Sequence, residues 1–144
     1  MHISFGNDHA GIELKKNILL IIKKLGHTYI NHGTDKLESV DYPDFIHPVA
    51  VDVREKKANF GIIICGSGNG ANMTANKYPE IRSALCWNPE LSSLARQHNN
   101  ANILSLPARF VTNETAVEIV KVFLSTDFEG GRHKKRINKI NQCK

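Results

Sequence analysis

Hydrophobic and polar positions follow two different periods along this chain, and short apolar runs alternate with longer amphipathic stretches. Residues 2–5 are apolar-rich and predict a strand, and a glycine-containing turn at residues 6–11 separates them from the first amphipathic stretch. There the hydrophobic residues recur near the spacing of one helical face, at Ile12, Leu14, Ile18, Ile21, Ile22 and Leu25. Gly26 is a suitable helix stop, so the first unit is a strand followed by a helix.

The same strand-then-helix unit recurs through the rest of the sequence. Residues 60–65, Phe-Gly-Ile-Ile-Ile-Cys, predict the central strand, because a continuous β-branched run is typical of a strand buried on both faces. The other predicted strands cover residues 28–31, 81–86 and 102–105. Helices are predicted from Pro43 to about residue 53, through residues 73–75, from about 89 to 97 and from about 113 to 124.

Five such units predict an α/β fold, because parallel neighbouring strands need crossover connections and helices supply them. We expect a three-layer α/β/α sandwich with a Rossmann-like, five-stranded parallel sheet. The basic segment from Arg132 to Gln142 predicts an appended C-terminal helix. The chain has no internal repeat or linker, so we expect residues 1–144 to form a single domain. In such folds ligands bind at the carboxyl ends of the strands.

Composition removes several classes of protein from consideration. A hydrophobic fraction of 41% over 144 residues is that of a globular chain and excludes disorder. No run approaches the ~18 apolar residues that cross a bilayer, and the first residues lack the basic and apolar regions of a signal peptide. We therefore expect a cytoplasmic protein that does not bind membranes.

The net charge of +5 is concentrated near the C-terminus, between Gly130 and Lys139. A basic segment is often only a solvated helix face, and this one lacks the interleaved aromatic residues of a nucleic-acid-binding surface. Arg132 and Arg136 are four residues apart, so on a helix they share one face and can hold one phosphate. Arg109, which follows the last predicted strand, can join them.

The turn Cys65-Gly-Ser-Gly-Asn-Gly70 follows the central strand and begins a helix. Its backbone N–H groups can converge on an anion in front of the helix dipole; the alternative interpretation is that the glycines serve only tight packing. Ala71 follows the last glycine, so the turn lacks the Gly-Lys-Ser/Thr of a P-loop and the third glycine of a dinucleotide fingerprint. The same alanine excludes the arginine of a cysteine-phosphatase loop.

Side chains able to move protons surround this turn in the predicted topology. Cys65 ends the central strand, where glycine amides and a helix N-terminus favour a thiolate. Asp8 and His9 follow the first strand, and His98 with Asn99 ends a helix, so we expect these residues at one edge of the sheet with Cys65 between the histidines. A histidine suits acid/base work.

The remaining candidate chemistry is sparse. The other two cysteines, Cys86 and Cys143, are interpreted as small apolar residues, and an odd number of cysteines without a C-x-x-C pair disfavours a disulfide framework. No Asp/Glu/His group has metal-ligand spacing along the sequence, so we expect chemistry without a metal.

Several of these segments, taken together and in order, resemble the ribose-5-phosphate isomerase B family, within the sugar-phosphate isomerases that include the galactose-6-phosphate isomerase subunits. The matching segments span almost the whole chain. They are Gly6-Asn-Asp-His-Ala-Gly11, Asp41-Tyr-Pro-Asp44, Ile64-Cys-Gly-Ser-Gly-Asn-Gly70, Ala75-Asn-Lys77, Arg96-Gln-His-Asn99, Asn102-Ile-Leu104, and Glu129-Gly-Gly-Arg-His133 with Arg136.

The resemblance implies interconversion of D-ribose 5-phosphate and D-ribulose 5-phosphate through an enediolate, in the non-oxidative pentose phosphate pathway, without a cofactor or metal. It implies that Cys65 is the base that moves the proton between C2 and C1, that Ser67 assists proton transfer between O1 and O2, and that His98 opens the furanose ring. Substrate-binding roles are implied for Asp8, His9, Tyr42, Gly66, Ser67, Gly68, Asn69, Gly70, Asn99, Arg109, Arg132 and Arg136, with the phosphate held by His9 and the three arginines.

The resemblance also implies a homodimer whose site is shared between protomers, with the pairing of dimers into tetramers left open. Ser67 stands where many members have threonine, and Asn69 replaces a commonly aliphatic residue and bears on sugar preference. Allose 6-phosphate or galactose 6-phosphate is therefore an alternative substrate. Two other functions stay open at this point: a non-catalytic module that binds a sugar phosphate, and nucleic-acid binding through the basic tail, which rests on charge alone.

Overall fold

The computed structural model describes residues 1–142 and contains a parallel β-sheet. Its strands are β1 (His2–Asn7), β2 (Thr28–Asn31), β3 (Phe60–Cys65), β4 (Ser83–Leu85) and β5 (Ile103–Pro107). They lie in the order β2-β1-β3-β5-β4, and every neighbouring pair is parallel. The predicted five-stranded parallel sheet is confirmed, and β3 is its central strand.

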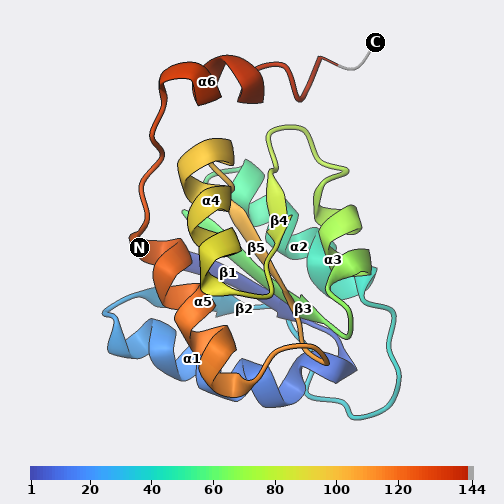
Figure 1. Cartoon of the computed structure of the whole chain (residues 1–144). Helices are drawn as coiled ribbons and strands as arrows, with labels where there is room; N and C mark the ends of the chain where they lie inside the picture. The colour runs from blue at the N-terminus through green and yellow to red at the C-terminus, as the bar shows by residue number, and fades with distance from the viewer. Residues whose placement is uncertain (143–144) are drawn as a thin grey trace.

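Helices cover both faces of the sheet, as Figure 1 shows. In chain order they are the short 3-10 helix η1 (His9–Gly11), α1 (Ile12–Lys24), α2 (Pro43–Arg54), α3 (Asn69–Ala75), α4 (Pro89–Asn99), α5 (Asn113–Ser125) and α6 (Gly131–Ile137). The buried residues of α1, α4 and α5 share one core cluster, and those of α2 and α3 share another. The predicted three-layer α/β/α sandwich is therefore confirmed. No helix within residues 1–142 is both long and apolar enough to cross a membrane.

The central strand contributes to the cores on both faces of the sheet. Ile62 and Ile64 lie in the cluster beneath α1 and α5, whereas Ile63 and Cys65 lie in the cluster beneath α2 and α3. This alternation follows from the two-residue period of a strand. All three isoleucines are fully buried, and each contributes about 1.5–3 kcal/mol by leaving water. The apolar sequence of β3 thus fixes its central position.

Two elements are shorter in the structure than the sequence predicts. The strand expected at residues 81–86 is limited to β4, because the amide of Arg82 donates to the side-chain oxygen of Asn102 at 2.8 Å instead of extending the ladder. The appended helix ends at Ile137 rather than at Gln142. Beyond it the amides of Lys139 and Ile140 bond carbonyls three residues back, as in successive turns.

The connection between β2 and α2 is anchored from beneath by a buried lysine. Lys15 of α1 is 5% exposed and pairs with Asp35 at 2.9 Å, and its ammonium also donates to the carbonyl of Thr34 at 3.3 Å. The side-chain amide of Asn7 donates to the same carbonyl at 3.0 Å. These bonds fix the start of a loop whose far end carries Val40 and Tyr42 to the carboxyl edge of the sheet.

Candidate active site

The glycine turn after β3 is a tightly packed backbone feature of the carboxyl edge. Gly68 has a positive φ of 75°, and a Cβ at this position would collide with Leu85 and crowd the backbone of Leu106 and Pro107. Its carbonyl accepts a hydrogen bond from the buried hydroxyl of Ser105 at 2.8 Å. Glycine is therefore required here by both conformation and space. Tight packing explains Gly68, but it does not explain the groups that surround the turn.

The two candidate catalytic groups of the turn differ in exposure. Cys65 is only 4% exposed, is unpaired, and sits in the core cluster at the end of β3. Its carbonyl accepts from the amide of Ala108 at 2.9 Å, which ties the end of β3 to the chain leaving β5. Ser67 is exposed, and its hydroxyl accepts from the amide of Asn69 at 3.3 Å. A thiol thus lies at the base of the turn and a hydroxyl at its rim.

Asp8 and His9 lie beside this turn, as the sequence predicted. The amide of Asp8 donates to the carbonyl of Ile64 at 3.2 Å, and its carboxylate accepts from the amide of Ala10 at 2.9 Å as the cap of η1. The backbone amide of Val40 donates to Nδ1 of His9 at 3.2 Å. Because Nδ1 accepts, the ring proton resides on Nε2, so His9 can donate through Nε2 to a bound anion.

Tyr42 and Arg109 flank the turn on its two sides. The ring of Tyr42 lies over Gly70, where a Cβ would approach its hydroxyl to 2.8 Å, and the side chain is 37% exposed. The amide of Arg109 donates to the carbonyl of Gly66 at 3.0 Å, and its guanidinium lies 3.4 Å from a Cβ built on that glycine. A phenol, a guanidinium, an imidazole and a thiol thus meet at one edge, an arrangement suited to an anionic substrate.

The expectation that His98 and Asn99 share this edge is wrong for a single chain. Helix α4 starts after β4 at the carboxyl edge and runs back, so its last residues lie at the amino edge. There the side chain of Arg82, which directly precedes β4, donates to the carbonyl of Asn99 at 3.0 Å. Helices in strand–helix–strand units run antiparallel to the sheet, so the two ends of a helix belong to opposite edges. Cys65 therefore does not lie between His9 and His98.

The end of α4 is held in place by Arg96, whose guanidinium is packed into the protein. This side chain donates to the carbonyls of Ala101 at 2.6 Å and Thr126 at 3.1 Å, and it covers the ring of Phe60 at 4.6 Å. Burial lowers the pKa of Arg96, with the neighbouring Arg82 adding to the effect and Asp127 opposing it. Arg96 thus links α4 to the segment that leads into α6.

His98 forms a second cluster with residues that precede and belong to α6. Its ring stacks on that of His133 with centroids 4.2 Å apart and planes 6° apart. The Nε2 atoms of His98 and His133 lie 3.9 Å and 3.7 Å from one carboxylate oxygen of Glu129. Burial, and then the charges of His98 and Arg132, lower the pKa of His133. Arg132 and Arg136 both belong to α6, as predicted.

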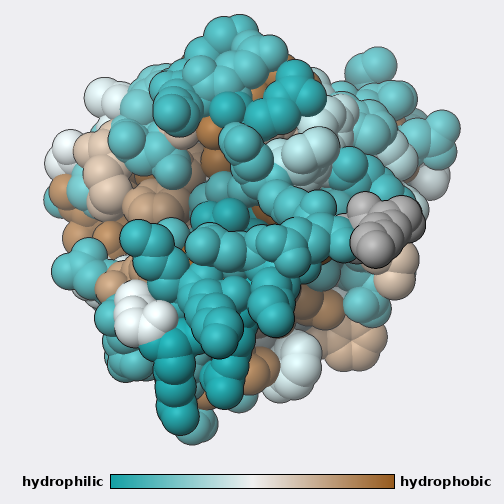
Figure 2. Space-filling model, turned by 90° about the horizontal axis from the view of Figure 1, so that it is seen from above, coloured by the Kyte–Doolittle hydropathy of each residue, from teal (hydrophilic) through white to brown (hydrophobic). Residues whose placement is uncertain are grey.

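Sequence reasoning did not assign roles to Glu129 and His133. The signal available was their four-residue spacing, although Glu129 precedes α6 and does not share its helix with His133. Their approach to His98 depends on how α6 packs on α4, which no local pattern encodes. Figure 1 shows α6 lying across the end of α4, away from the carboxyl edge. In Figure 2, which views this face, hydrophilic side chains dominate the region that α6 crosses.

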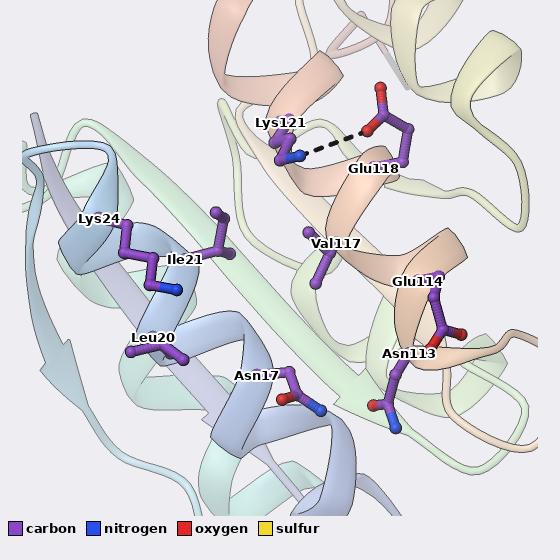
Figure 3. A pocket seen from close by; sticks show the side chains of 9 residues that line it. All are labelled: Asn17, Leu20, Ile21, Lys24, Asn113, Glu114, Val117, Glu118 and Lys121. Atoms are coloured by element: carbon purple, nitrogen blue, oxygen red, sulfur yellow. Dashed lines mark ion pairs between the residues drawn. The ribbon is translucent and has the colours of Figure 1, made fainter.

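Two hollows on the surface differ in whether they hold predicted site residues. One adjoins the glycine turn and includes Ser67 and Asn69 with the exposed aromatic residues Trp87 and Phe110. The other lies between α1 and α5 and is lined by lysine, glutamate, asparagine and aliphatic side chains (Figure 3). Its Lys121 pairs with Glu118 of the same helix at 3.6 Å. It holds none of the predicted site residues, so the carboxyl edge remains the candidate site.

The interpretation of Cys86 as a small buried residue is confirmed. It is 1% exposed and unpaired, and burial raises the pKa of its thiol to about 12. Such a thiol stays protonated near neutral pH and is a poor nucleophile. Cys143 lies outside the described residues.

Comparisons with known proteins agree with the motifs. A model of the family described as Ribose/Galactose Isomerase matches residues 3–140. Ribose-5-phosphate isomerase B of Escherichia coli strain K12 is 40% identical over 138 residues, which are 96% of this chain and 93% of that protein. The resemblance inferred from the sequence is thereby confirmed.

Solved structures give the same result. Ribose-5-phosphate isomerase B of Clostridium thermocellum superposes with a TM-score of 0.96 at 45% identity, over 99% of this chain and 96% of that one. The enzyme of Mycoplasma genitalium, solved with bound ribulose-5-phosphate, superposes with a TM-score of 0.94 at 41% identity, over 98% and 94% of the two chains. The fold is therefore shared over nearly the whole chain.

Proposed function

Because this chain belongs to the ribose/galactose isomerase family, we propose that it interconverts D-ribose 5-phosphate and D-ribulose 5-phosphate. One observation carries the proposal: Cys65 and Ser67 lie on a glycine turn between a phenol and a guanidinium, beside a histidine with a free donor. This set offers a base, a hydroxyl and cationic anchors without any redox cofactor. Aldose–ketose isomerisation needs groups of these kinds and no cofactor.

The phosphate is held by one imidazole N–H group and three guanidinium groups. Nε2 of His9 donates to one phosphate oxygen, since its Nδ1 is engaged by the amide of Val40. The guanidinium of Arg109, packed against Gly66, provides a second anchor. Arg132 and Arg136, one helical turn apart on α6, complete the grip from a second protomer.

The chemistry then proceeds by ring opening and proton transfer. His98 donates a proton to the furanose oxygen as its bond to C1 breaks, and the C1 hydroxyl loses its proton to water to give the open aldehyde, while Asp8 and Asn99 hold other sugar hydroxyls. The thiolate of Cys65 removes the proton from C2 of the open aldose, and the electrons of the C–H bond form the C1–C2 double bond of the enediolate. Ser67 transfers the proton between O2 and O1, and Cys65 returns its proton to C1, which gives the ketose. The backbone amides from Gly66 to Gly70 stabilise the negative oxygens.

The division of these groups between two sheet edges supports a homodimer. In one chain the thiol and His9 lie at the carboxyl edge, whereas His98 and the α6 arginines lie at the amino edge. A complete site therefore forms when the α4–α6 end of one protomer meets the carboxyl edge of its partner. The aromatic side chains of Trp87 and Phe110, 54% and 72% exposed beside the turn, supply apolar surface for that contact.

The decisive experiment assays metal-free protein in parallel with ribose 5-phosphate, allose 6-phosphate and galactose 6-phosphate. We expect turnover of ribose 5-phosphate and exchange of its C2 proton with solvent. Cys65→Ala should abolish both while leaving substrate binding intact, and Cys86→Ala, which alters a buried thiol in the core cluster on the other face of the sheet, should retain activity. Full activity of Cys65→Ala would refute the assigned base, and binding without proton exchange in the unmodified protein would instead indicate a sugar-phosphate-binding module.

A further inference from the structure

The cluster of His98, Glu129 and His133 brings together three side chains that can each bind a metal ion. Each residue presents one ligand atom, and the three atoms lie within 4.8 Å of one another. They come from the end of α4, from the segment before α6 and from α6 itself. Two imidazole nitrogens therefore face one carboxylate oxygen at the junction of two helices.

This donor set has a definite metal preference. Imidazole nitrogen binds Zn²⁺ well, whereas Mg²⁺ and Ca²⁺ prefer sites made of oxygen ligands. Two histidines and one glutamate also form a known three-ligand zinc set that leaves a fourth position open for water. The three residues thus match Zn²⁺ by type and by number.

The backbone holds the ligands close together before any ion arrives. The amide of Glu129 donates to the carbonyl of Gln97 at 3.1 Å, which anchors the segment to the end of α4. Gly130 and Gly131 follow with positive φ values of 69° and 52°, and they turn the chain into α6, which carries His133. Nothing lies within 4 Å of a Cβ at either glycine, so their role here is conformational.

A metal requires only a small closure of this arrangement. Bonds of about 2.0–2.1 Å in a tetrahedral site put neighbouring ligand atoms about 3.3 Å apart, against 3.7 Å and 3.9 Å from Glu129 to the two imidazoles. The stacked rings must also tilt so that both Nε2 lone pairs point at the ion. The side chains of His98 and Glu129 are 37% and 51% exposed, so both have room to turn and the ion has access.

The surrounding charge acts in two directions. Arg132 and Arg136 repel a dication, which limits affinity. The carboxylate of Glu129 attracts the dication and offsets part of this repulsion.

We propose that His98, Glu129 and His133 form a Zn²⁺-binding site, and that Zn²⁺ held there inhibits the protein. The metal takes the Nε2 lone pair of His98, which can then no longer carry the proton for ring opening. Binding depends only on the three ligands, whereas inhibition rests on the proposed function. The site does not make the isomerisation metal-dependent, because the proposed base, Cys65, lies at the other edge of the sheet.

The first test measures Zn²⁺ binding by calorimetry on chelator-treated, dialysed protein, with no sugar phosphate present. We expect one equivalent per chain, a loss of affinity of at least about tenfold in His133→Gln and in Glu129→Gln, and no loss in the control His47→Gln, which removes an exposed histidine of α2. Co²⁺ should give the strong visible absorption of a four-coordinate site in the unmodified protein and in His47→Gln, but not in His133→Gln or Glu129→Gln. If His133→Gln disturbs α6, the isosteric Glu129→Gln carries the test. Equal binding by all variants would overturn the site.

The second test measures turnover of ribose 5-phosphate with increasing Zn²⁺. We expect loss of activity that EDTA reverses, and a shift of at least about tenfold in the inhibiting concentration in Glu129→Gln. Zn²⁺ bound at one equivalent without loss of turnover would overturn the inhibitory role. If the protein turns over no sugar phosphate, the calorimetry still decides whether the metal site exists.

Discussion

Cys65 and His98 lie at opposite edges of the same parallel sheet, the first at the end of β3 and the second near the end of α4 beside the residue that precedes β4. Both are expected to act on one sugar. A helix that leaves the carboxyl edge must end at the amino edge, so no side-chain movement within one chain brings the two groups together. Under the proposed function, the two residues therefore act together across an interface between two copies of the chain.

This relationship predicts complementation between two inactive variants. Cys65→Ala and His98→Asn should each be inactive alone, because every site then lacks the base or the ring-opening acid. When the two are unfolded, mixed and refolded together, each mixed dimer has one site with both groups intact. Random pairing makes half of the dimers mixed, so the recovered activity should approach a quarter of that of the unmodified protein. Steady-state assays with ribose 5-phosphate measure it.

The control is to refold each variant separately and to mix the products afterwards, which should recover nothing if dimers do not exchange. A preparation of Cys65→Ala mixed with Cys65→Ser gives no complete site and should stay inactive. If the co-refolded mixture is no more active than each variant alone, the site is not shared between protomers.

Local patterns predicted the elements and their class, because burial on both faces leaves a continuous apolar run, as in Ile62, Ile63 and Ile64 of β3. The turn residues near β3 and the first strand were also predictable, since a strand end fixes the edge at which the next residue lies. The position of His98 was predicted wrongly. His98 lies near the C-terminal end of α4, and a helix that starts at the carboxyl edge of the sheet ends at the amino edge. The Glu129–His133 approach to His98 was missed, since it depends on the packing of α6 on α4.

A second prediction compares two buried serine hydroxyls, of which only one donates a hydrogen bond to the glycine turn. Ser105 is fully buried in β5 and donates to the carbonyl of Gly68 at 2.8 Å, while Ser92 is fully buried in α4 and donates to the carbonyl of Ile119 at 2.9 Å. Replacing either hydroxyl with alanine removes one buried hydrogen bond, at a cost of about 1 kcal/mol of unfolding free energy. Urea unfolding should therefore give similar losses for the two variants.

Their activities should differ. Ser105→Ala frees the turn that carries Ser67, and small misplacements of catalytic groups are costly, so kcat/KM should fall about tenfold. Ser92→Ala leaves the turn untouched and should keep kcat/KM within about twofold of the unmodified value. Equal activity of the two variants would show that the Ser105 bond does not position the turn.

A third prediction concerns the crowding at Gly68. Alanine at a positive φ costs about 1–2 kcal/mol from backbone conformation alone, and Gly26, with φ 77° and nothing within 4 Å of a Cβ, isolates that cost. At Gly68 the new methyl group also meets Leu85 and the backbone of Pro107. Gly68→Ala should therefore lower the unfolding free energy by at least about 1 kcal/mol more than Gly26→Ala. Matching losses in urea unfolding would mean that the turn relaxes without strain.

The last prediction concerns alkaline stability. Burial raises the pKa of Cys86 to about 12, whereas an unfolded thiol ionises near 8.5. Between these values the unfolded chain has lost the proton that the folded chain retains, so the unfolded state gains stability as the pH rises. The contribution of Cys86 to the unfolding free energy should therefore be fully present below about pH 8 and decline by about 1.4 kcal/mol per pH unit above about pH 9.

Urea unfolding of the unmodified protein and of Cys86→Ala at pH 8, 9 and 10 measures this contribution. The variant removes this thiol but keeps every other group that titrates in this range, so its unfolding free energy should fall less steeply. Parallel curves for the two proteins would show that the Cys86 thiol ionises as readily in the folded chain as in the unfolded one.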